Sequence, residues 1–238
     1  VSDELWNELK PYFLPENHPI KANLDALFSM QRLLTSRKTL KHAGFNVLKH
    51  PQREIVIARH PALKGYLVKA YLDNKRIDEW RWWKKRIDGA RQIQECIDRY
   101  NFNALMKTPK KWIYPLPSEP SPPNVPGIQR KNFILVVEDM NILSKKENKK
   151  AFKARMTTPL LDAIFIVLSE NLLVDSIFAP NIPFSRDGKI AFIDTEHFNN
   201  VTRSMKYWKL LKYLSPEMRE YWKMIIPSPE QNPAAPPI

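Results

Sequence analysis

Cysteine, glycine and long apolar runs are all scarce in this sequence of 238 residues. Cys96 is the only cysteine, which excludes an internal disulfide framework and a cysteine-based metal cage and fits a reducing compartment. No stretch reaches the roughly 18 to 20 apolar residues needed to span a bilayer. Residues 1–10 are acidic and amphipathic, unlike a secretory signal. We therefore expect a soluble, cytoplasmic protein without a transmembrane segment.

The sequence also lacks the residues that are characteristic of two classes of hydrolase. The five histidines show neither a pair on one helix face nor the spacing of zinc ligands, which argues against zinc hydrolysis. None of the five glycines stands two residues from a serine, so the Gly-x-Ser-x-Gly pattern of a nucleophile elbow is absent. Any catalytic chemistry must therefore use other residues than zinc-binding histidines or a nucleophilic serine of this type.

Aromatic residues and positive charge are abundant. Eleven Phe, eight Tyr and seven Trp, within 43% hydrophobic residues, provide enough apolar surface for a folded core. The formal net charge of +13 favours polyanionic partners: a nucleotide, a nucleic acid, an acidic membrane or a phosphorylated ligand. Charge alone does not choose among these partners.

The first half of the chain changes from helical to strand periodicity. Residues 1–43 are predicted to be a helical extension, because apolar residues recur there near helical spacing. Residues 46–50, 53–59 and 65–72 are predicted to form a three-stranded meander. Residues 78–100 follow as one long amphipathic helix.

Two further strands and a proline-rich segment come next. Lys111 to Tyr114 and Asn132 to Glu138 have strand character. Six prolines lie between Pro115 and Pro126, which excludes both helix and strand there. Residues 115–127 are therefore predicted to be a surface insertion.

The second half begins with a polar, basic joint at residues 145–153. Thr157 or Thr158 can cap a buried helix that runs from Leu160 to Asn171 after Pro159. Short strands are predicted at the three segments 172–174, 182–184 and 189–193, with a hairpin turn at Asp187-Gly188. Residues 203–226 form a last helical region before a proline-rich tail at 227–238.

This order of elements resembles the protein-kinase-like fold from about Gly44 to Asp194. The resemblance implies an α+β protein with a small lobe, residues 44–140, made of a five-stranded antiparallel sheet with one inserted helix. It also implies a reduced helical lobe at residues 141–226, because only 44 residues follow Asp194. Such a short lobe is similar to that of atypical kinases and kinase-like bacterial effectors, and an effector would act after delivery into a host cell.

Lys69 carries the first part of the resemblance. It lies in the apolar strand Leu67-Val-Lys-Ala-Tyr71, where kinases place the lysine that holds the α- and β-phosphates of ATP. The alternative is an edge-strand lysine that faces solvent. The family pairs this lysine with a helix acid, for which Glu79 and Glu95 are the two candidates.

The segment from Asn132 to Leu143 resembles the hinge between kinase lobes. Adenine would there bind the backbone of Glu138, Asp139 and Met140. A buried strand that ends in a loop explains the same residues equally well.

The strongest part of the resemblance is the segment from Asp175 to Glu196. Asn181 and Asp194 are thirteen residues apart, as in the kinase catalytic loop and metal-binding motif, and Gly188 falls at the intervening turn. A hairpin would turn both oxygen ligands toward one Mg²⁺ beside the phosphates. Glu196 is either a further metal ligand or a solvated acid, and an ordinary hairpin is the alternative for the whole segment.

The sequence departs from the kinase pattern in two places: at the catalytic base and at the glycine-rich loop that covers the phosphates. Leu173-Val-Asp175 replaces the usual His-Arg-Asp, and Asp175 is the candidate catalytic base although Ser176 occupies the strictly aligned place. No glycine-rich loop lies between Gly44 and Arg53.

The sequence therefore predicts an ATP- and Mg²⁺-dependent phosphotransferase of atypical kinase type with an unidentified acceptor. A catalytically degenerate, pseudokinase-like binding or regulatory domain is the first alternative. A basic nucleic-acid-binding module is the second, based on the interleaved rings and cations of residues 80–86. The basic run at residues 145–155 suggests an acidic or phosphorylated protein or lipid as a partner, or simply a solvated surface.

Overall fold

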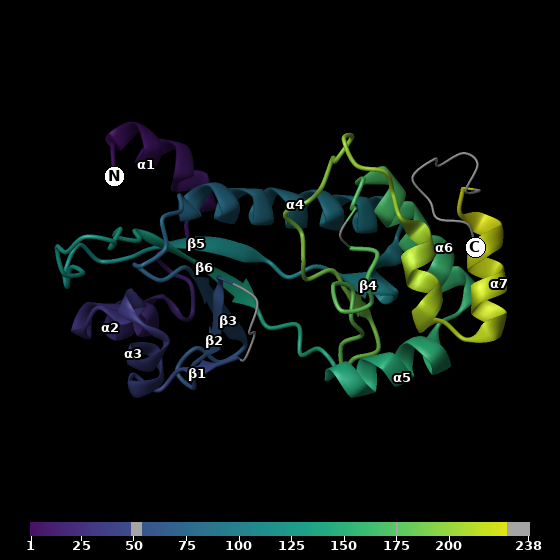
Figure 1. The fold of residues 1–238 in the computed structure, drawn as a ribbon, viewed down its shortest axis with the longest axis horizontal. Helices are drawn as coiled ribbons and strands as arrows, with labels where there is room; N and C mark the ends of the chain where they lie inside the picture. The colour runs from purple at the N-terminus through teal and green to yellow at the C-terminus, as the bar shows by residue number, and fades with distance from the viewer. Residues whose placement is uncertain (49–53, 175, 228–238) are drawn as a thin grey trace. The chain divides into compact units, whose positions relative to one another are not determined.

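The computed structural model describes residues 1–48, 54–174 and 176–227, which form two compact units (Figure 1). The first unit contains residues 1–87 and 110–139, and the second contains residues 88–109 and the chain from Met140 onward. Residues 88–109 thus belong to the second unit, whereas the sequence placed them in the first lobe. The long helix α4, Glu79–Arg99, contributes its first part to one unit and its second part to the other.

The first unit is built around the five-stranded sheet that the sequence predicts. The strand order is β1-β2-β3-β6-β5 and every neighbouring pair is antiparallel. Helix α4 follows the third strand, as expected, and the protein is of the α+β class. The strands are β1 Asn46–Val47, β2 Val56–Arg59, β3 Tyr66–Ala70, β5 Lys111–Pro115 and β6 Phe133–Glu138. Residues 49–53, which include the end of the first predicted strand and the start of the second, lie outside the described residues.

Both faces of this sheet are covered. Alternate residues of β6 point to opposite sides, and the residues on both sides are buried. Ile134 and Val136 belong to an apolar cluster with helices α2, Lys21–Met30, and α3, Arg37–His42. Phe133 and Leu135 belong to a second cluster with Leu9 of α1, Asp3–Leu9, and with Trp83 and Ile87 of α4. The continuous apolar run of β6 is therefore explained by burial on two sides. Short 3₁₀ helices cover Lys10–Tyr12, Leu33–Thr35, Phe102–Ala104 and Tyr207–Tyr213.

Buried charges join distant segments of the first unit. Asp73 is fully buried and accepts from Arg32 Nε at 2.9 Å and from the backbone N–H of Lys131 at 3.0 Å. Lys131 is also fully buried, and its Nζ donates to Ile77 O at 2.8 Å and lies 3.9 Å from Glu79 Oε2. Burial raises the pKa of Glu79 and lowers the pKa of Lys131. These ionic contacts tie the N-terminal extension, the start of α4 and β6 together.

One arginine holds the proline-rich insertion between β5 and β6. Arg130 donates at 2.8 Å to the carbonyl oxygens of both Pro117 and Ser118, and at 2.7 Å to Ser121 Oγ. Pro115 is the last residue of β5, contrary to the prediction, but residues 116–127 have neither helix nor strand, as predicted, because proline supplies no backbone N–H. Arg130 therefore supplies hydrogen bonds that the prolines cannot donate, in addition to the backbone bond from Leu116 N to Asn132 O at 2.8 Å.

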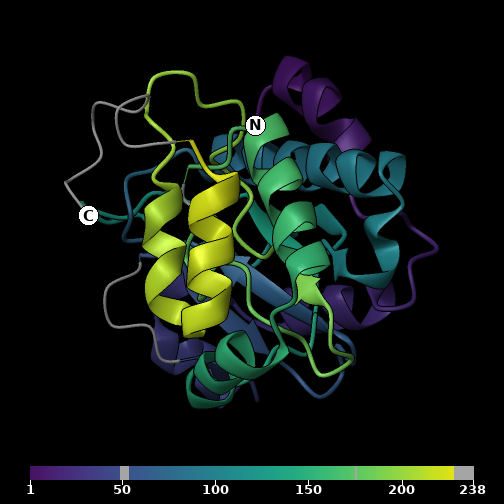
Figure 2. The same ribbon diagram turned by 90° about the vertical axis from the view of Figure 1, so that its right-hand side faces the viewer.

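The second unit is mainly helical around one large apolar cluster. Its helices are α5 Lys145–Arg155, α6 Thr158–Glu170 and α7 Pro216–Ile225, and α6 packs beside α7 (Figure 2). The strands β4, Met106–Lys107, and β7, Ile190–Ala191, form a short parallel pair. Thr157 Oγ1 accepts from Leu160 N at 3.4 Å, so the predicted cap of α6 is confirmed.

Three predictions for this unit are wrong. Residues 182–184, expected to be a strand, form only an isolated antiparallel bridge between Phe184 and Ile190. Residues 145–153, expected to be a polar joint, lie in α5, which begins with a reciprocal capping box between Ser144 and Glu147. Residues 172–174, expected to be a strand, form a turn in which Leu172 has a φ of 47°. Of the predicted tail, residues 228–238 lie outside the described part of the chain. No helix in the part that the structure describes is long and apolar enough to cross a membrane.

Candidate functional site

The predicted hairpin is present and brings Asn181 next to the residue that precedes Asp194. Ile193 N donates to Asn181 O at 3.2 Å, and Ala191 N donates to Pro183 O at 2.8 Å. The turn contains Gly188 at a φ of 86°, a conformation that side chains disfavour. Backbone pairing thus makes neighbours of two segments whose candidate ligands are thirteen residues apart in sequence.

Ser176 fixes the far end of this hairpin. Its hydroxyl donates to the backbone carbonyl of Asp194 at 3.0 Å, and the residue is buried. This hydrogen bond holds the main chain of Asp194 and does not involve the Asp194 carboxylate. Asp175, the candidate base, lies outside the residues that the structure describes.

Asp194, Glu196 and Asn181 supply hard oxygen donors. Oδ1 of Asp194 and Oε2 of Glu196 are both shielded from solvent. Across the described residues there is no group of three or more His, Cys, Asp or Glu side chains that could hold a metal. A metal here would instead rely on one amide, one or two carboxylates and oxygens from a ligand. Mg²⁺ accepts such a donor set, because it keeps water and phosphate in its coordination shell.

Gly89 of α4 permits a close approach that the sequence analysis did not identify. A Cβ at this position would lie 1.8 Å from Thr195 O and 2.8 Å from Phe198 Cδ1. The segment just after Asp194 therefore packs directly on the helix backbone. A lone glycine inside a strongly helical pattern was the available signal.

Lys69 lies inside the sheet of the first unit. Its strand β3 is paired with β2 and β6, opposite Ile57 and Leu135, and the residue is only 8% exposed. The alternative of an edge-strand lysine in solvent is therefore wrong. A buried lysine is costly unless a charged or polar partner compensates it, which favours a specific role.

The two candidate helix acids have different environments. Glu79 is buried and its Oε1 accepts from the backbone N–H groups of Asn132 at 2.7 Å and Phe133 at 3.2 Å. Glu95 is exposed on the later part of α4. Glu79 thus fastens α4 to β6, while the pairing of either acid with Lys69 stays a prediction.

The expected hinge has already used some of its main-chain donors. Glu138 N donates to Lys110 O at 3.0 Å, and Asp139 N donates to Gly65 O at 2.9 Å. The Asp139 carboxylate also binds Arg59, with Oδ1 3.1 Å from Nη2. Adenine could not receive hydrogen bonds from these two N–H groups. Recognition by this segment would depend on Met140 and on carbonyl oxygens.

The cluster of rings and cations at residues 80–86 contributes to packing. Trp83 is fully buried and its Nε1 donates to Phe133 O at 3.2 Å. Trp80 and Trp82 are half-buried against the same apolar cluster. Cations lie over both rings, with Arg81 Cζ 5.0 Å from the Trp80 centroid and Lys85 Nζ 5.4 Å from the Trp82 centroid. These rings are already covered, which weakens the case for base stacking.

No protein-family model matches the chain, and no curated protein sequence matches it.

Proposed function

We propose that this protein is an ATP- and Mg²⁺-dependent phosphotransferase that resembles atypical kinases. The observation that carries the proposal is the hairpin, in which Asn181 O accepts from Ile193 N at 3.2 Å. This pairing supports a shared task for Asn181 and Asp194. The five-stranded sheet with α4 after its third strand, and the buried Lys69 in β3, are consistent with the same resemblance.

Each residue has a distinct chemical task in this proposal. Lys69 supplies a fixed positive charge for the phosphates. Asn181 and Asp194, with Glu196 as an additional candidate, offer oxygen ligands to the metal. Mg²⁺, when bound, would neutralise charge on the transferred phosphoryl group. Asp175 orients the acceptor hydroxyl or takes its proton.

Thermal unfolding with ATP tests the binding step. ATP with Mg²⁺ should raise the melting temperature, because saturation at a hundredfold excess over Kd adds about 2.7 kcal/mol of stability. Lys69→Ala and Asp194→Ala should each reduce the shift, and Asp194→Ala should remove most of the difference that Mg²⁺ makes. Lys64→Ala is the matched control, because Lys64 is exposed just before β3. Equal shifts in all four proteins would contradict the proposed roles.

Transfer is tested separately with γ-labelled ATP. Label should appear on the protein or in released phosphate in the presence of Mg²⁺, and Asp194→Ala should abolish it. Asp175→Ala should lower the rate by about 10²-fold or more if Asp175 is the general base.

A nucleotide-binding domain without turnover is the second candidate, and Ser176 favours it. Ser176 is buried and its hydroxyl is committed to Asp194 O at 3.0 Å, so it cannot replace the usual catalytic aspartate. ATP binding that depends on Lys69, combined with no transfer in wild type, would support this candidate. An ATP-independent, strongly salt-dependent affinity for RNA that survives Asp194→Ala would instead favour the nucleic-acid module.

A further inference from the structure

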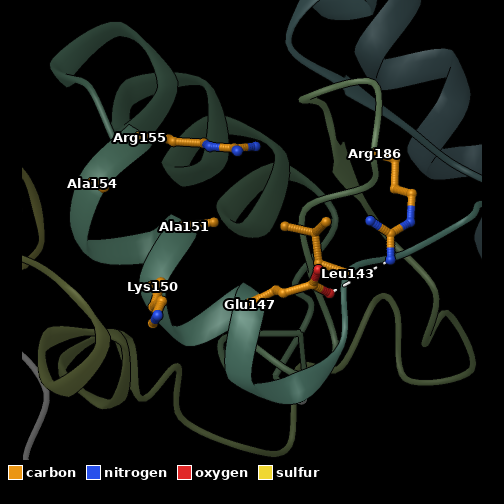
Figure 3. Close-up of a pocket in the computed structure, with 7 residues that line it drawn as sticks. All are labelled: Leu143, Glu147, Lys150, Ala151, Ala154, Arg155 and Arg186. Carbon is orange, nitrogen blue, oxygen red and sulfur yellow. Dashed lines mark ion pairs between the residues drawn. The ribbon is translucent and has the colours of Figure 1, made fainter.

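A cavity of about 350 Å³ lies in the second unit, between α5 and the hairpin (Figure 3). Its lining combines a small apolar surface with several charged side chains. The lining residues are Leu143, Glu147, Lys150, Ala151, Ala154, Arg155 and Arg186. None of them belongs to the candidate metal site.

A buried amide holds the two walls of this cavity together. Asn148 of α5 donates through Nδ2 to Ala179 O at 3.1 Å, and its Oδ1 accepts from Phe184 N at 2.9 Å. Leu143, one of the lining residues, is fixed by backbone pairing, since its N–H donates to Phe184 O at 2.9 Å. Arg186 N donates to Asn141 O at 3.0 Å in the same ladder. The backbone that carries the lining residues is therefore held in place, so that binding a ligand would have to order only their exposed side chains.

The one carboxylate in the lining is already engaged. Glu147 Oε2 accepts from Ser144 N at 2.9 Å and lies 3.6 Å from Arg186 Nη2. The Ser144 contacts lower the pKa of Glu147. Glu147 therefore stays ionised and helps to orient Arg186 without filling the cavity.

Arg155 supplies the second guanidinium. Figure 3 shows Arg155 extending above Ala151 and Leu143, while Arg186 approaches Glu147 from the other side and Lys150 points away from both arginines. Arg155 makes no ion pair with any residue in the described ranges. Three cations and one carboxylate leave the lining with a formal charge of +2.

We propose that this cavity binds a phosphomonoester dianion. The arginines Arg155 and Arg186 carry the argument, because guanidinium groups bind phosphate oxygens through paired N–H donors, and the lining as a whole has a net positive charge. Leu143 and the two alanines would contact the carbon atoms next to the ester oxygen. The same group occurs on phosphorylated serine or threonine side chains and on small phosphate esters.

Two probes distinguish these sources. Calorimetric titrations use an acetylated Ala-phosphoserine-Ala amide, its unphosphorylated form, and glycerol 1-phosphate, all at constant ionic strength. The phosphopeptide or glycerol 1-phosphate should bind, and the unphosphorylated peptide should not. Preference for the phosphopeptide would identify a protein side chain as the source, and preference for glycerol 1-phosphate would identify a small ester. Absence of binding by both phosphorylated probes would overturn the proposal.

Charge-removing variants locate the site. Arg155→Gln and Arg186→Gln should each weaken binding about tenfold or more, as expected for loss of a charge-assisted hydrogen bond. Ala154→Leu should block the cavity while keeping every charge. Lys153→Gln is the matched control, since Lys153 is an exposed cation of the same helix outside the lining. If Lys153→Gln weakened binding as much as Arg155→Gln, attraction to a basic surface would explain the data and the cavity would not.

The phosphomonoester proposal and the proposed nucleotide site can be contradicted separately. Lys69→Ala and Asp194→Ala should leave phosphopeptide and glycerol 1-phosphate affinity within twofold of wild type. Arg155→Gln should leave the ATP-dependent rise in melting temperature unchanged. Loss of phosphomonoester binding in Lys69→Ala would assign these probes to the nucleotide site and overturn the separate one.

Discussion

The two units fasten distant segments by different chemistry. In the first unit, the buried carboxylate of Asp73 joins Arg32 and the backbone N–H of Lys131. In the second unit, ion pairs such as Lys107–Asp187 lie at the surface and neutral groups make the buried links: the amide of Asn148 binds Ala179 O at 3.1 Å and Phe184 N at 2.9 Å, and the hydroxyl of Ser176 binds Asp194 O.

This difference determines what each unit loses when a fastening group is removed. Removing one partner of a buried ion pair leaves an uncompensated charge in a medium of low polarity. Removing a neutral group leaves at most a donor or acceptor without its hydrogen bond. In the second unit, charged residues such as Arg155 and Arg186 are not needed for these buried links, which leaves them available for a ligand.

The largest effect should come from the charged network. Asp73→Ala should lower the free energy of unfolding by about 3 to 5 kcal/mol, because it strands the buried charge of Arg32. Urea unfolding measures this. Glu54→Ala is the control, since Glu54 pairs with Lys75 at 3.2 Å on the surface and such pairs contribute about 1 kcal/mol or less. Similar losses in both variants would remove the distinction between the units.

The next effect should come from the close contact at Gly89. Gly89→Ala would normally stabilise a helix, but here the new methyl group would meet Thr195 O at 1.8 Å. We expect a loss of about 2 kcal/mol in urea unfolding from overpacking, together with a smaller Mg²⁺-ATP shift as the segment after Asp194 moves. Lys85→Ala, an exposed change on the same helix, should stay within about 0.5 kcal/mol of wild type. A stabilised Gly89→Ala protein would disprove the tight packing.

A smaller effect should follow from the neutral fastening at Ser176. Ser176→Ala leaves Asp194 O without its 3.0 Å hydrogen bond and should cost about 1 kcal/mol in urea unfolding. The Mg²⁺ dependence of ATP binding should fall with it, because Asp194 is less firmly placed. Ser29→Ala, in an exposed helix position, serves as control. An unchanged Mg²⁺ response would show that Ser176 only stabilises the fold.

The smallest effect should be a pH dependence from Asp187. Burial alone would raise its pKa, but hydrogen bonds from Lys107, Ser185 and Lys189 outweigh it and lower the pKa to about 2. Because this value lies below the unfolded value of about 3.9, the contribution is complete above pH about 4. It is lost as the pH falls from about 4 to about 2. Melting temperatures across this range should decline less steeply in Asp187→Asn, and parallel curves would contradict the assignment.

The sequence predicts the elements whose periodicity matches their burial. Helices α4 and α6 and the strands β3, β5 and β6 follow from apolar spacing, because their buried residues recur at the expected intervals. Helix α5 was missed since few of its side chains are apolar, although the Ser144-x-x-Glu147 capping box was visible. Residues 172–174 were misassigned because a short apolar run does not distinguish a buried turn from a strand.

The candidate site was only partly predictable. The thirteen-residue interval and Asp187-Gly188 were enough to predict the hairpin that joins Asn181 to Ile193. The contact of Gly89 with Thr195 could not be predicted, because it depends on how a helix packs against a segment about a hundred residues later. The hydrogen bonds of Asn148 could not be predicted either, because they join α5 to residues more than thirty positions later.

We expect the hydrogen bonds of Arg130 to slow proteolysis of the proline-rich insertion. Exposed loops are preferred cleavage sites because their backbone can enter a protease cleft, and Arg130 restrains this loop by binding the carbonyl oxygens of Pro117 and Ser118. Without that guanidinium, we expect a protease of broad specificity to cut the insertion faster. A single arginine thus helps to keep the chain intact between the paired strands β5 and β6.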